Sequence, residues 1–400
     1  MADENSKKRK HQEQDDDICA EEEEKSKREM MSKLPIEIFF DILRRLPIKS
    51  LFHCRWVNRF WFNSIKNPSF IEMYHSTVIF DNSPCIIYQL MSYYRDPYFK
   101  DLECLGATDD IPMPTLCNPK MPVSTLPIYS CNGLIFSGEK HTWPESYSFF
   151  ICNPVTGEQI AIAKPTYDDR YDVKSGFGFA PKSKVFKVIR MVNVRMEYWA
   201  ETDAEVYNCA TGNWRIIRNV PYLFNLFYFE TPKTNVVVNG AFHWIGFPNL
   251  AKADEVIVAF DLETEVFQEV PLPCGFKLDT DKFKQYLVVL GERLCIVHTV
   301  KKEHIEIWVM KDYGVESSWV KEYVIKDIMW DDYCEGPYKP IKLMPNGDIL
   351  LFSAGQSLGY YDPLKKIYRH GGYLIWSPEL EPVLHVVSLI SPRNGLGSAE

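Results

Sequence analysis

The chain has 400 residues, of which 46% are hydrophobic, enough for one large core or two domains. A net charge of −9 argues against a general nucleic-acid-binding surface, and no apolar run approaches the roughly 20 residues of a membrane-spanning helix. The eleven cysteines are dispersed, odd in number and never spaced as Cys-x-x-Cys. Because the chain opens with charge and not with an apolar signal segment, we expect reduced thiols in an intracellular protein.

Residues 1–31 are predicted to form a disordered, charged tail. Acidic runs alternate with basic ones, and too few aliphatic residues are present to offset the entropy of ordering the segment. Two basic clusters are similar to a bipartite nuclear-import signal, which predicts a protein of the nucleus and cytoplasm. The residues of this signal are Lys7, Lys8, Arg9, Lys10, Lys27 and Arg28. The alternative is a solvated mixed-charge tail without an import function.

The next segment, 32–75, holds apolar residues for three short helices in about forty positions, too few to bury a core comfortably. Apolar pairs four residues apart, such as Ile38 with Ile42 and Phe39 with Leu43, predict a first helix that is apolar around most of its circumference. Two further short helices follow. A small helical cluster with more apolar surface than it can hide is typical of a docking element for another protein.

This segment resembles the F-box. The residues that carry the resemblance fall at the family's spacing: Leu34-Pro35, Glu37-Ile38, Ile42-Leu43, Arg45-Leu46-Pro47, Lys49-Ser50-Leu51, Arg55, Val57, Trp61, Pro68 and Phe70-Ile71. The resemblance implies a Skp-type adaptor as partner and, through it, a cullin scaffold. It implies the following positions as adaptor contacts or their support: Leu34, Pro35, Ile38, Leu43, Leu46, Pro47, Leu51, Val57 and Trp61. Trp56 departs from the pattern, because relatives usually hold a smaller residue there. The alternative is an amphipathic helical hairpin that belongs to the main fold.

Beyond residue 75 the chain changes to short alternating apolar strands separated by turn residues, which predicts mostly β structure. A first turn signal consists of an apolar strand end, then Asn or Asp, then a short polar loop. It recurs at intervals of 55, 53, 51 and 50 residues, the fourth copy being the weakest. Its anchors are Asn153, Asn208, Asp261, Asp312 and Asp362.

A second turn signal, Asn-Gly before an apolar strand, occurs at Asn132-Gly133, Asn239-Gly240 and Asn346-Gly347, with both intervals equal to 107. Halfway between these pairs lie two other turn sequences, at 181–184 and 291–292, each followed by a strand. Two turn series with one period indicate that each repeat holds two hairpin turns, for which Asn-Gly is suited because it adopts positive φ.

A period near 50 with about four strands is typical of a kelch-like β-propeller. Five repeats are visible and a sixth is expected around 93–97, so we predict a three-helix F-box followed by a propeller of about six blades. Residues 76–395 also resemble the F-box-associated domain that follows the F-box in a large plant family. The double-glycine signature of kelch repeats is absent. The alternative architecture is a β-sandwich or a stack of irregular sheets.

Motifs for catalysis, metals or cofactors find no support in the sequence. Cys295 and His298 approach ligand spacing, but on a strand they point to opposite faces. The pair Gly176 and Gly178 lacks the third glycine and the helix of a dinucleotide site, and more simply eases close strand packing. No Gly-x-Ser-x-Gly elbow is present. We therefore expect no catalytic residue, no metal and no cofactor.

A dense aromatic run at 222–229 is where we expect the substrate surface, with core packing as the alternative for each ring. The residues predicted to contact a substrate are Tyr222, Phe224, Phe227 and Tyr228. Together with the resemblance, this predicts a non-catalytic substrate receptor of an SCF-type ubiquitin ligase that recruits an unidentified protein. The alternatives are a non-ligase F-box scaffold, or a β-propeller that is a small-molecule receptor or enzyme.

Overall fold

The computed structural model describes residues 34–46, 48–81, 85–88, 98–101, 129–142, 145–167, 173–196, 199–224, 235–248, 254–278, 285–300, 303–326, 338–353, 357–373 and 382–393. The chain divides into two units, Met1–Phe80 and Asp81–Glu400. The boundaries expected from the sequence, after residues 31, 75 and 395, stay predictions. Within the described residues, no helix combines the length and the apolar character that crossing a membrane requires.

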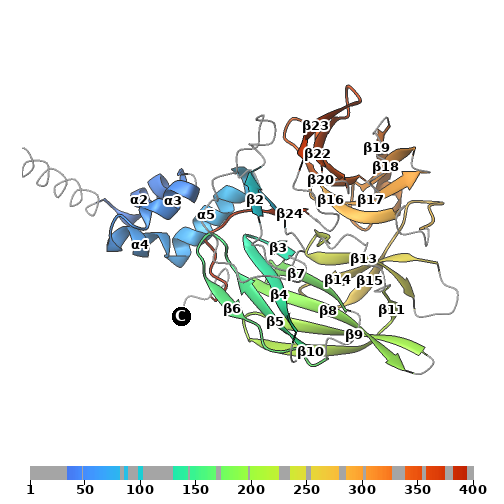
Figure 1. Ribbon diagram of the computed structural model, residues 1–400, viewed down its shortest axis with the longest axis horizontal. Helices are drawn as coiled ribbons and strands as arrows, with labels where there is room; N and C mark the ends of the chain where they lie inside the picture. The colour runs from blue at the N-terminus through green and yellow to red at the C-terminus, as the bar shows by residue number, and fades with distance from the viewer. Residues whose placement is uncertain are drawn as a thin grey trace, which may run out of the picture. The chain divides into compact units, whose positions relative to one another are not determined.

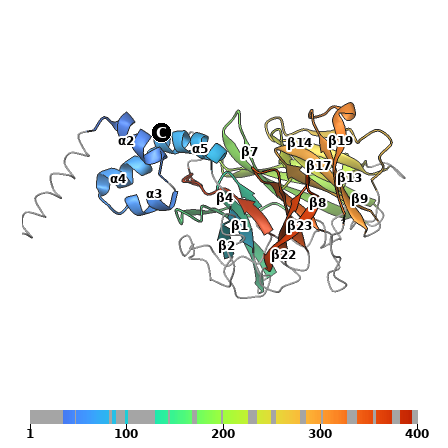
Figure 2. The same ribbon diagram turned by 90° about the horizontal axis from the view of Figure 1, so that it is seen from above.

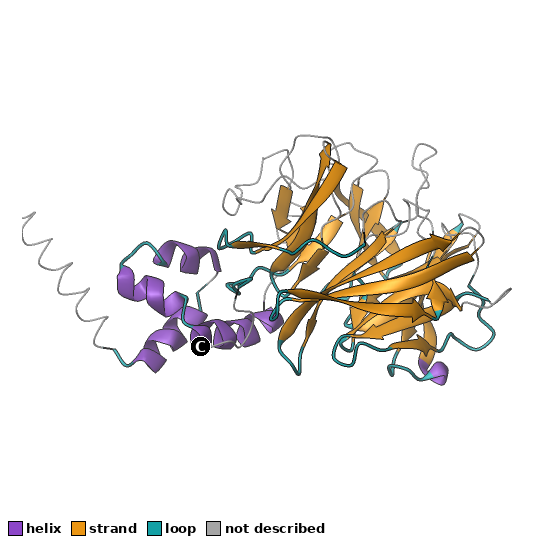
Figure 3. Cartoon of the chain, turned by 90° about the horizontal axis from the view of Figure 1, so that it is seen from below, coloured by secondary structure: helices purple, strands orange, loops and turns teal. Residues whose placement is uncertain are grey.

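The described part of the first unit is helical, blue in Figure 1 and purple in Figure 3. Its helices are α2 (Ile36–Arg44), α3 (Ile48–Cys54), α4 (Arg59–Ile65) and α5 (Pro68–Asp81). Pro35 stands at the N-cap of α2, where a missing N–H costs nothing. Asn58 caps α4, because its side-chain oxygen accepts the N–H of Trp61 at 3.0 Å. The expected three-helix segment is confirmed, and α5 extends it.

The second unit consists of antiparallel sheets, five of which follow one another along the chain (Figure 1). We call them blades 1 to 5. Blade 1 contains β3 (Tyr129–Cys131), β4 (Leu134–Thr142), β5 (Glu145–Cys152) and β6 (Gln159–Ala161); blade 2 contains β7 (Val173–Ala180), β8 (Val185–Met196), β9 (Trp199–Asn208) and β10 (Asn213–Val220). Blade 3 contains β11 (Tyr222–Leu223), β12 (Val237–Val238), β13 (Ala241–Pro248), β14 (Val256–Asp261) and β15 (Phe267–Val270). Blade 4 contains β16 (Gln285–Leu290), β17 (Arg293–Val300), β18 (His304–Met310) and β19 (Trp319–Ile325), with the short helix η2 (Glu316–Ser318) before β19; blade 5 contains β20 (Lys339–Leu343), β21 (Ile349–Ser353), β22 (Ser357–Asp362) and β23 (Ile367–Tyr373).

A further sheet joins the two ends of this unit. It contains β1 (Cys85–Tyr88), which pairs on one side with β2 (Tyr98–Asp101) and on the other with β24 (Pro382–His385). Figure 2 shows β1 and β2 in the blue-green of the early chain among red strands of the late chain. We call this the closing sheet, because it pairs strands that are about 300 residues apart. The mostly β propeller fold is confirmed, whereas the expected position of a sixth repeat, 93–97, lies outside the described residues.

The core lies between neighbouring blades, which explains why many strands are apolar on both faces. Along β17, Leu294 and Ile296 pack with residues of blade 3, whereas the alternating Cys295 and Val297 pack with residues of blade 5. All four side chains are buried. A blade with two apolar faces is insoluble alone and is stabilised by a neighbour on each side.

Both turn series expected from the sequence lie at hairpins of the blades. The Asn-Gly pairs Asn132-Gly133 and Asn239-Gly240 connect β3 to β4 and β12 to β13, and all four residues have positive φ. The anchors connect the last two strands, and in four blades their side-chain oxygen accepts the N–H groups two and three residues further on, at 2.7–3.2 Å. At the weaker copy, Asp312, the turn is longer, and its carbonyl accepts the hydroxyl of Ser318 at 2.8 Å.

The glycine pair of β7, Gly176 and Gly178, packs against side chains of blade 3. A Cβ atom at Gly176 would lie 2.9 Å from the ring of Phe242, and one at Gly178 would lie 2.9 Å from both Phe242 and Leu262. Real Cβ atoms are not found this close to other heavy atoms. The expectation that these glycines ease close strand packing is therefore confirmed.

Beyond β24 the chain continues as a clasp (residues 386–391) on blade 1. The hydroxyl of Ser388 donates to the carbonyl of Asn132 at 3.0 Å. The side-chain amide of Asn153, which is fully buried, donates to the carbonyls of Ser388 and Ile390 at 2.9 and 2.8 Å. The clasp thus contacts the β3–β4 and β5–β6 turns of blade 1 and, like the closing sheet, joins the end of the chain to an early part of the ring.

Candidate functional site

Helix α2 divides its apolar residues between an inner and an outer face. Phe39 and Leu43 are fully buried, whereas Ile38 and Ile42, four residues apart on the outer face, are exposed, Ile38 to 50% of its surface. Ile36, in the first turn, is also exposed but on another side of the helix. Each isoleucine left in water forgoes about 1–3 kcal/mol of burial. This outer face is therefore the strongest candidate in the unit for a protein-docking surface.

The inner face of α2 is fixed by aromatic packing. The ring of Phe39 lies 5.0 Å from the rings of both Phe60 and Trp61, distances typical of favourable aromatic pairs. The hydroxyl of Tyr74 on α5 donates to the carbonyl of Leu46 at 3.4 Å. Because the inner side is anchored in this way, the isoleucines on the outer side are held in place before a partner arrives.

A charge cluster lies on the same helix. Asp41 accepts hydrogen bonds from the guanidinium groups of Arg44 and Arg45, the second at 2.7 Å. The hydrogen bond from Arg44 makes the largest contribution to lowering the pKa of Asp41, and that from Arg45 the next largest. The carboxylate is therefore charged at neutral pH. Fixed charges beside an apolar surface orient a partner more than they strengthen its binding.

The positions that the F-box resemblance implies differ in exposure. Three are exposed: Pro35, Ile38 and Val57. Three are partly buried: Leu34, Leu46 and Trp61. Two are fully buried and can act only as support: Leu43 and Leu51. Pro47 lies outside the described residues, as does the basic nuclear-import signal. Ile42, which shares the outer face with Ile38, carries the F-box resemblance but was not among the predicted adaptor contacts; Ile36 was in neither set.

The aromatic run at 222–229 lies partly in the core. Tyr222 and Phe224 are buried in the hydrophobic cluster between blades 2 and 3, and the ring of Phe224 lies 6.0 Å from that of Trp244. Phe227 and Tyr228 lie outside the described residues. The described half of the run therefore supports the scaffold, and the assignment of the run to a substrate surface stays a prediction.

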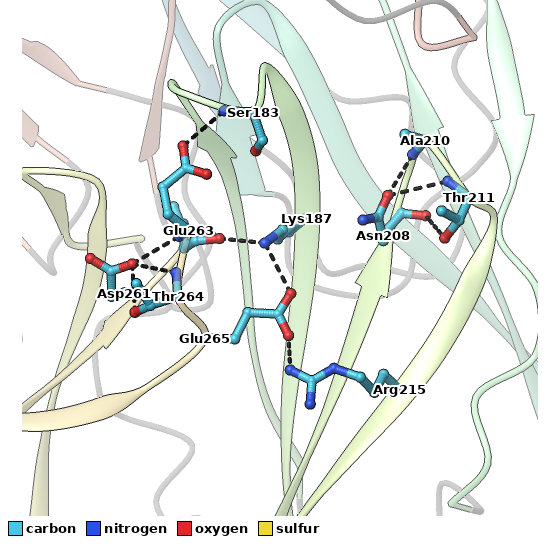
Figure 4. Close-up of polar contacts among 11 residues, drawn as sticks. Ser183, Lys187, Asn208, Ala210, Thr211, Arg215, Asp261, Glu263, Thr264 and Glu265 are labelled. Atoms are coloured by element: carbon cyan, nitrogen blue, oxygen red, sulfur yellow. Dashed lines mark hydrogen bonds and ion pairs between the residues drawn. The ribbon is translucent and has the colours of Figure 1, made fainter.

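Blades 2 and 3 are joined by a polar network around Lys187 (Figure 4). The ammonium of Lys187 donates to the carbonyl of Leu262 and lies 2.9 Å from the carboxylate of Glu265, which also pairs with Arg215. Burial lowers the pKa of Lys187, and the nearby charge of Glu263 opposes that shift. The network holds the anchored turn of blade 3 on blade 2, so loops carried by the two blades share one rigid support.

A buried ion pair fixes the connection between blades 1 and 2. Arg190 donates to Glu205 at 2.8 Å, with both side chains almost inaccessible to water. The second oxygen of Glu205 accepts the N–H groups of Thr166 and Tyr167 at 2.7 and 3.0 Å, and the guanidinium lies 5.2 Å from the ring of Phe149. Both carboxylate oxygens of Glu205 are thus occupied, which offsets part of the cost of burying its charge.

One pair of residues has the composition of a catalytic dyad. The hydroxyl of Ser130 lies 2.9 Å from Nδ1 of His385, but His385 is fully buried and burial lowers its pKa to about 3. The pair links blade 1 to the closing sheet, and a substrate has no access to the imidazole. Burial likewise raises the pKa of Cys295 to about 12, so that its thiol is protonated. Within the described ranges, no three His, Cys, Asp or Glu residues are grouped to hold a metal ion.

Sequence reasoning missed a repeated contact between blades. The indole N–H of Trp214 donates to the carbonyl of Ala163 at 2.7 Å, and that of Trp319 donates to the carbonyl of Pro271 at 2.8 Å. Each tryptophan lies at the start of the last strand of its blade, and each acceptor lies just beyond the last strand of the preceding blade. The sequence does contain a signal for this contact, because an aromatic residue follows four of the five turn anchors at a distance of six or seven positions. These residues are Trp214, Phe267, Trp319 and Tyr368.

Comparison with known proteins agrees with this architecture. The F-box domain family matches residues 31–73, and the F-box associated beta propeller domain family matches residues 106–339. F-box protein At3g07870 of Arabidopsis thaliana is 27% identical over 389 residues, covering 85% of this chain and 88% of that protein. F-box protein CPR1 of the same organism is 27% identical over 317 residues, covering 74% of each chain.

A helical docking unit followed by a closed ring of blades defines an F-box protein with a β-propeller. The propeller match spans more than half of the chain, and the chain belongs to the family of F-box proteins with an F-box associated beta propeller domain. Proteins of the F-box family are typically adaptor subunits. The two domains together support a general role in substrate recognition by SCF-type ubiquitin ligases.

Proposed function

We propose that this chain is the substrate-recognition subunit of an SCF-type cullin–RING ubiquitin ligase. The observation that carries the proposal is the outer face of α2, where Ile38 and Ile42 are exposed within a segment that matches the F-box. A Skp-type adaptor docks on this face and connects the chain to a cullin. The apolar interface supplies the affinity, and the charges around Asp41 orient the adaptor.

The propeller recruits a protein target, and the chain itself makes and breaks no bond. By holding a target lysine near a charged ubiquitin carrier, it raises the effective concentration of one reactant at the other. This mechanism requires a rigid connection between the loops that bind the target. The joints at Lys187 and Arg190 support it, because Lys187 contacts Leu262 and Glu265 of blade 3 and Arg190 lies over the ring of Phe149 in blade 1.

The proposal is tested by titrating the purified full-length chain with a Skp-type adaptor in a calorimeter. Replacement of both Leu34 and Pro35 by alanine is expected to abolish binding. The matched control replaces two exposed apolar residues of the propeller, Val266 and Ile367, by alanine and is expected to bind normally. A folded wild-type chain that does not bind the adaptor would overturn the proposal.

Reconstitution separates a ligase receptor from an F-box scaffold that acts outside a ligase. The chain is combined with adaptor, cullin–RING, ubiquitin-activating and ubiquitin-conjugating enzymes and ATP. Ubiquitin is expected to be transferred to the chain itself or to a captured protein in a manner that depends on Leu34 and Pro35. Adaptor binding without any such transfer would favour the scaffold.

We further propose that the protein occurs in the nucleus and the cytoplasm, on the basis of the two basic clusters at 7–10 and 27–28. A fluorescent fusion in which the six basic residues of these clusters are replaced by alanine is expected to leave the nucleus. An unchanged distribution would mean that the segment is a solvated tail.

A further inference from the structure

The turn between α3 and α4 exposes a large aromatic side chain. Trp56 is 81% exposed, and of the large hydrophobic side chains in the described part of the chain only Leu364, at 94%, is more exposed. An indole is the most expensive side chain to leave in water by apolar area. Such a residue on a small docking unit is a candidate anchor for the partner of that unit.

The backbone of this turn is fixed on both sides. The N–H of Trp56 donates to the carbonyl of His53 at 3.0 Å, and that of Val57 donates to the carbonyl of Cys54 at 3.2 Å. The next residue, Asn58, caps α4 with its side chain. The turn therefore presents the indole without a large ordering cost on binding, which is the condition for an efficient anchor.

The side chains of the turn are distributed as in an interface. Arg55 lies with its guanidinium 5.4 Å from the centre of the Phe62 ring, so the charged residue is held against the unit. Val57 is 51% exposed, and it occupies a position that the F-box pattern implies as an adaptor contact. Trp56 and Val57 thus form one exposed apolar surface, in which the indole of Trp56 enlarges the area presented by Val57.

We propose that Trp56 is an additional anchor for the Skp-type adaptor, one that inserts its indole into an apolar recess beside the contact of Val57. This rests on the proposed function and specifies it further, because it assigns a contact to an exposed residue that is larger than the family pattern requires.

Binding of full-length variants to the adaptor tests the proposal. Trp56→Ala is expected to weaken binding about 30-fold, or about 2 kcal/mol at 1.4 kcal/mol per factor of ten. Trp56→Phe retains most of the affinity, and Leu364→Ala, the matched exposed control in the propeller, has no effect. The thermal unfolding midpoints of all three stay at the wild-type value, because both side chains are already in water.

The outcomes separate the two proposals. If Trp56→Ala binds as tightly as wild type while the Leu34/Pro35 double variant does not bind, Trp56 is not an anchor but the adaptor-docking function stands. If the wild type does not bind, the function itself fails. If the wild type is a dimer that Trp56→Ala converts to a monomer, a second copy covers the indole and the inference is wrong.

A spectroscopic measurement places the indole without relying on affinity. The full-length chain is labelled with 5-fluorotryptophan, and the fluorine resonance missing in Trp56→Phe is assigned to Trp56. On addition of adaptor, this resonance is expected to shift and broaden, whereas that of the buried Trp244 stays in place. An unchanged Trp56 resonance in a saturated complex would contradict the proposal.

Discussion

The F-box helices and the propeller blades place the same residue type in opposite environments. In α2, isoleucines line the outer face and remain in water, whereas Ile296, Ile305 and Ile307 of blade 4 are fully buried between blades. A blade meets a neighbour of the same chain on each face, so its apolar surface is covered on folding. Ile38 and Ile42 of the F-box, by contrast, stay exposed within the described residues. Comparing the two regions shows that an apolar pattern demands burial without specifying whether the chain itself or a partner provides it.

The largest expected effect separates docking from folding. Ile38→Glu is expected to weaken adaptor binding about 1,000-fold, because it buries an unpaired carboxylate in the interface. Its control is Ile367→Glu in blade 5, since the two isoleucines are equally exposed, at 50% and 51%. Calorimetric titration should show normal binding for the control, and neither variant should change the unfolding midpoint. Equal losses of binding in the two variants would show that the outer face of α2 is not the docking surface.

A smaller effect is expected within the propeller, on stability alone. Asn153→Asp should lower the free energy of unfolding by about 3 kcal/mol, because a buried carboxylate cannot donate to the carbonyls of Ser388 and Ile390. Asn208→Asp is the matched control, since Asn208 anchors the same kind of turn by accepting two N–H groups. It should cost less than about 0.5 kcal/mol.

Urea denaturation followed by circular dichroism measures both values, and adaptor affinity should be unchanged in each variant. Similar costs for Asn153→Asp and Asn208→Asp would show that the clasp contributes nothing to stability.

The smallest effect is a dependence of propeller stability on pH. Burial lowers the pKa of His385 from 6.5 to about 3, so between these values the unfolded chain binds a proton that the folded chain does not. Stability therefore falls as the pH falls below 6.5, by about 2 kcal/mol at pH 5. In His385→Asn, the loss of stability between pH 7.5 and 5, measured by urea denaturation, should shrink by about that amount. An identical pH profile in the variant would mean that His385 is protonated in the folded ring.

The turns of the propeller could be predicted from the sequence because their chemistry is local. Asn208 accepts N–H groups two and three residues further along the chain, so its signal does not depend on the rest of the fold. The second role of Asn153 could not be predicted, since its acceptors lie 235 and 237 residues away. The same limit applies to Arg190 and Glu205, which meet only because two strands pair in one register.

The docking site was predictable in its position but not in its orientation. The F-box spacing identified the segment. The periodicity, however, predicted a helix that is apolar on nearly all sides, so it could not distinguish Phe39, which is buried, from Ile38, which is exposed. A dense aromatic run suggested a binding surface at Tyr222 and Phe224, although both rings lie in the core. Aromatic density indicates a demand for burial, and only the tertiary contacts decide whether the chain meets it.

The closing sheet has a consequence for synthesis of the protein. Strand β1 leaves the ribosome about 300 residues before its partner β24, which at about 5–20 residues per second is a delay of about 15–60 s. Throughout this time the helices that dock the adaptor are complete while the ring is open. A message cut short before residue 382 would therefore encode a protein with complete F-box helices but without a closed propeller.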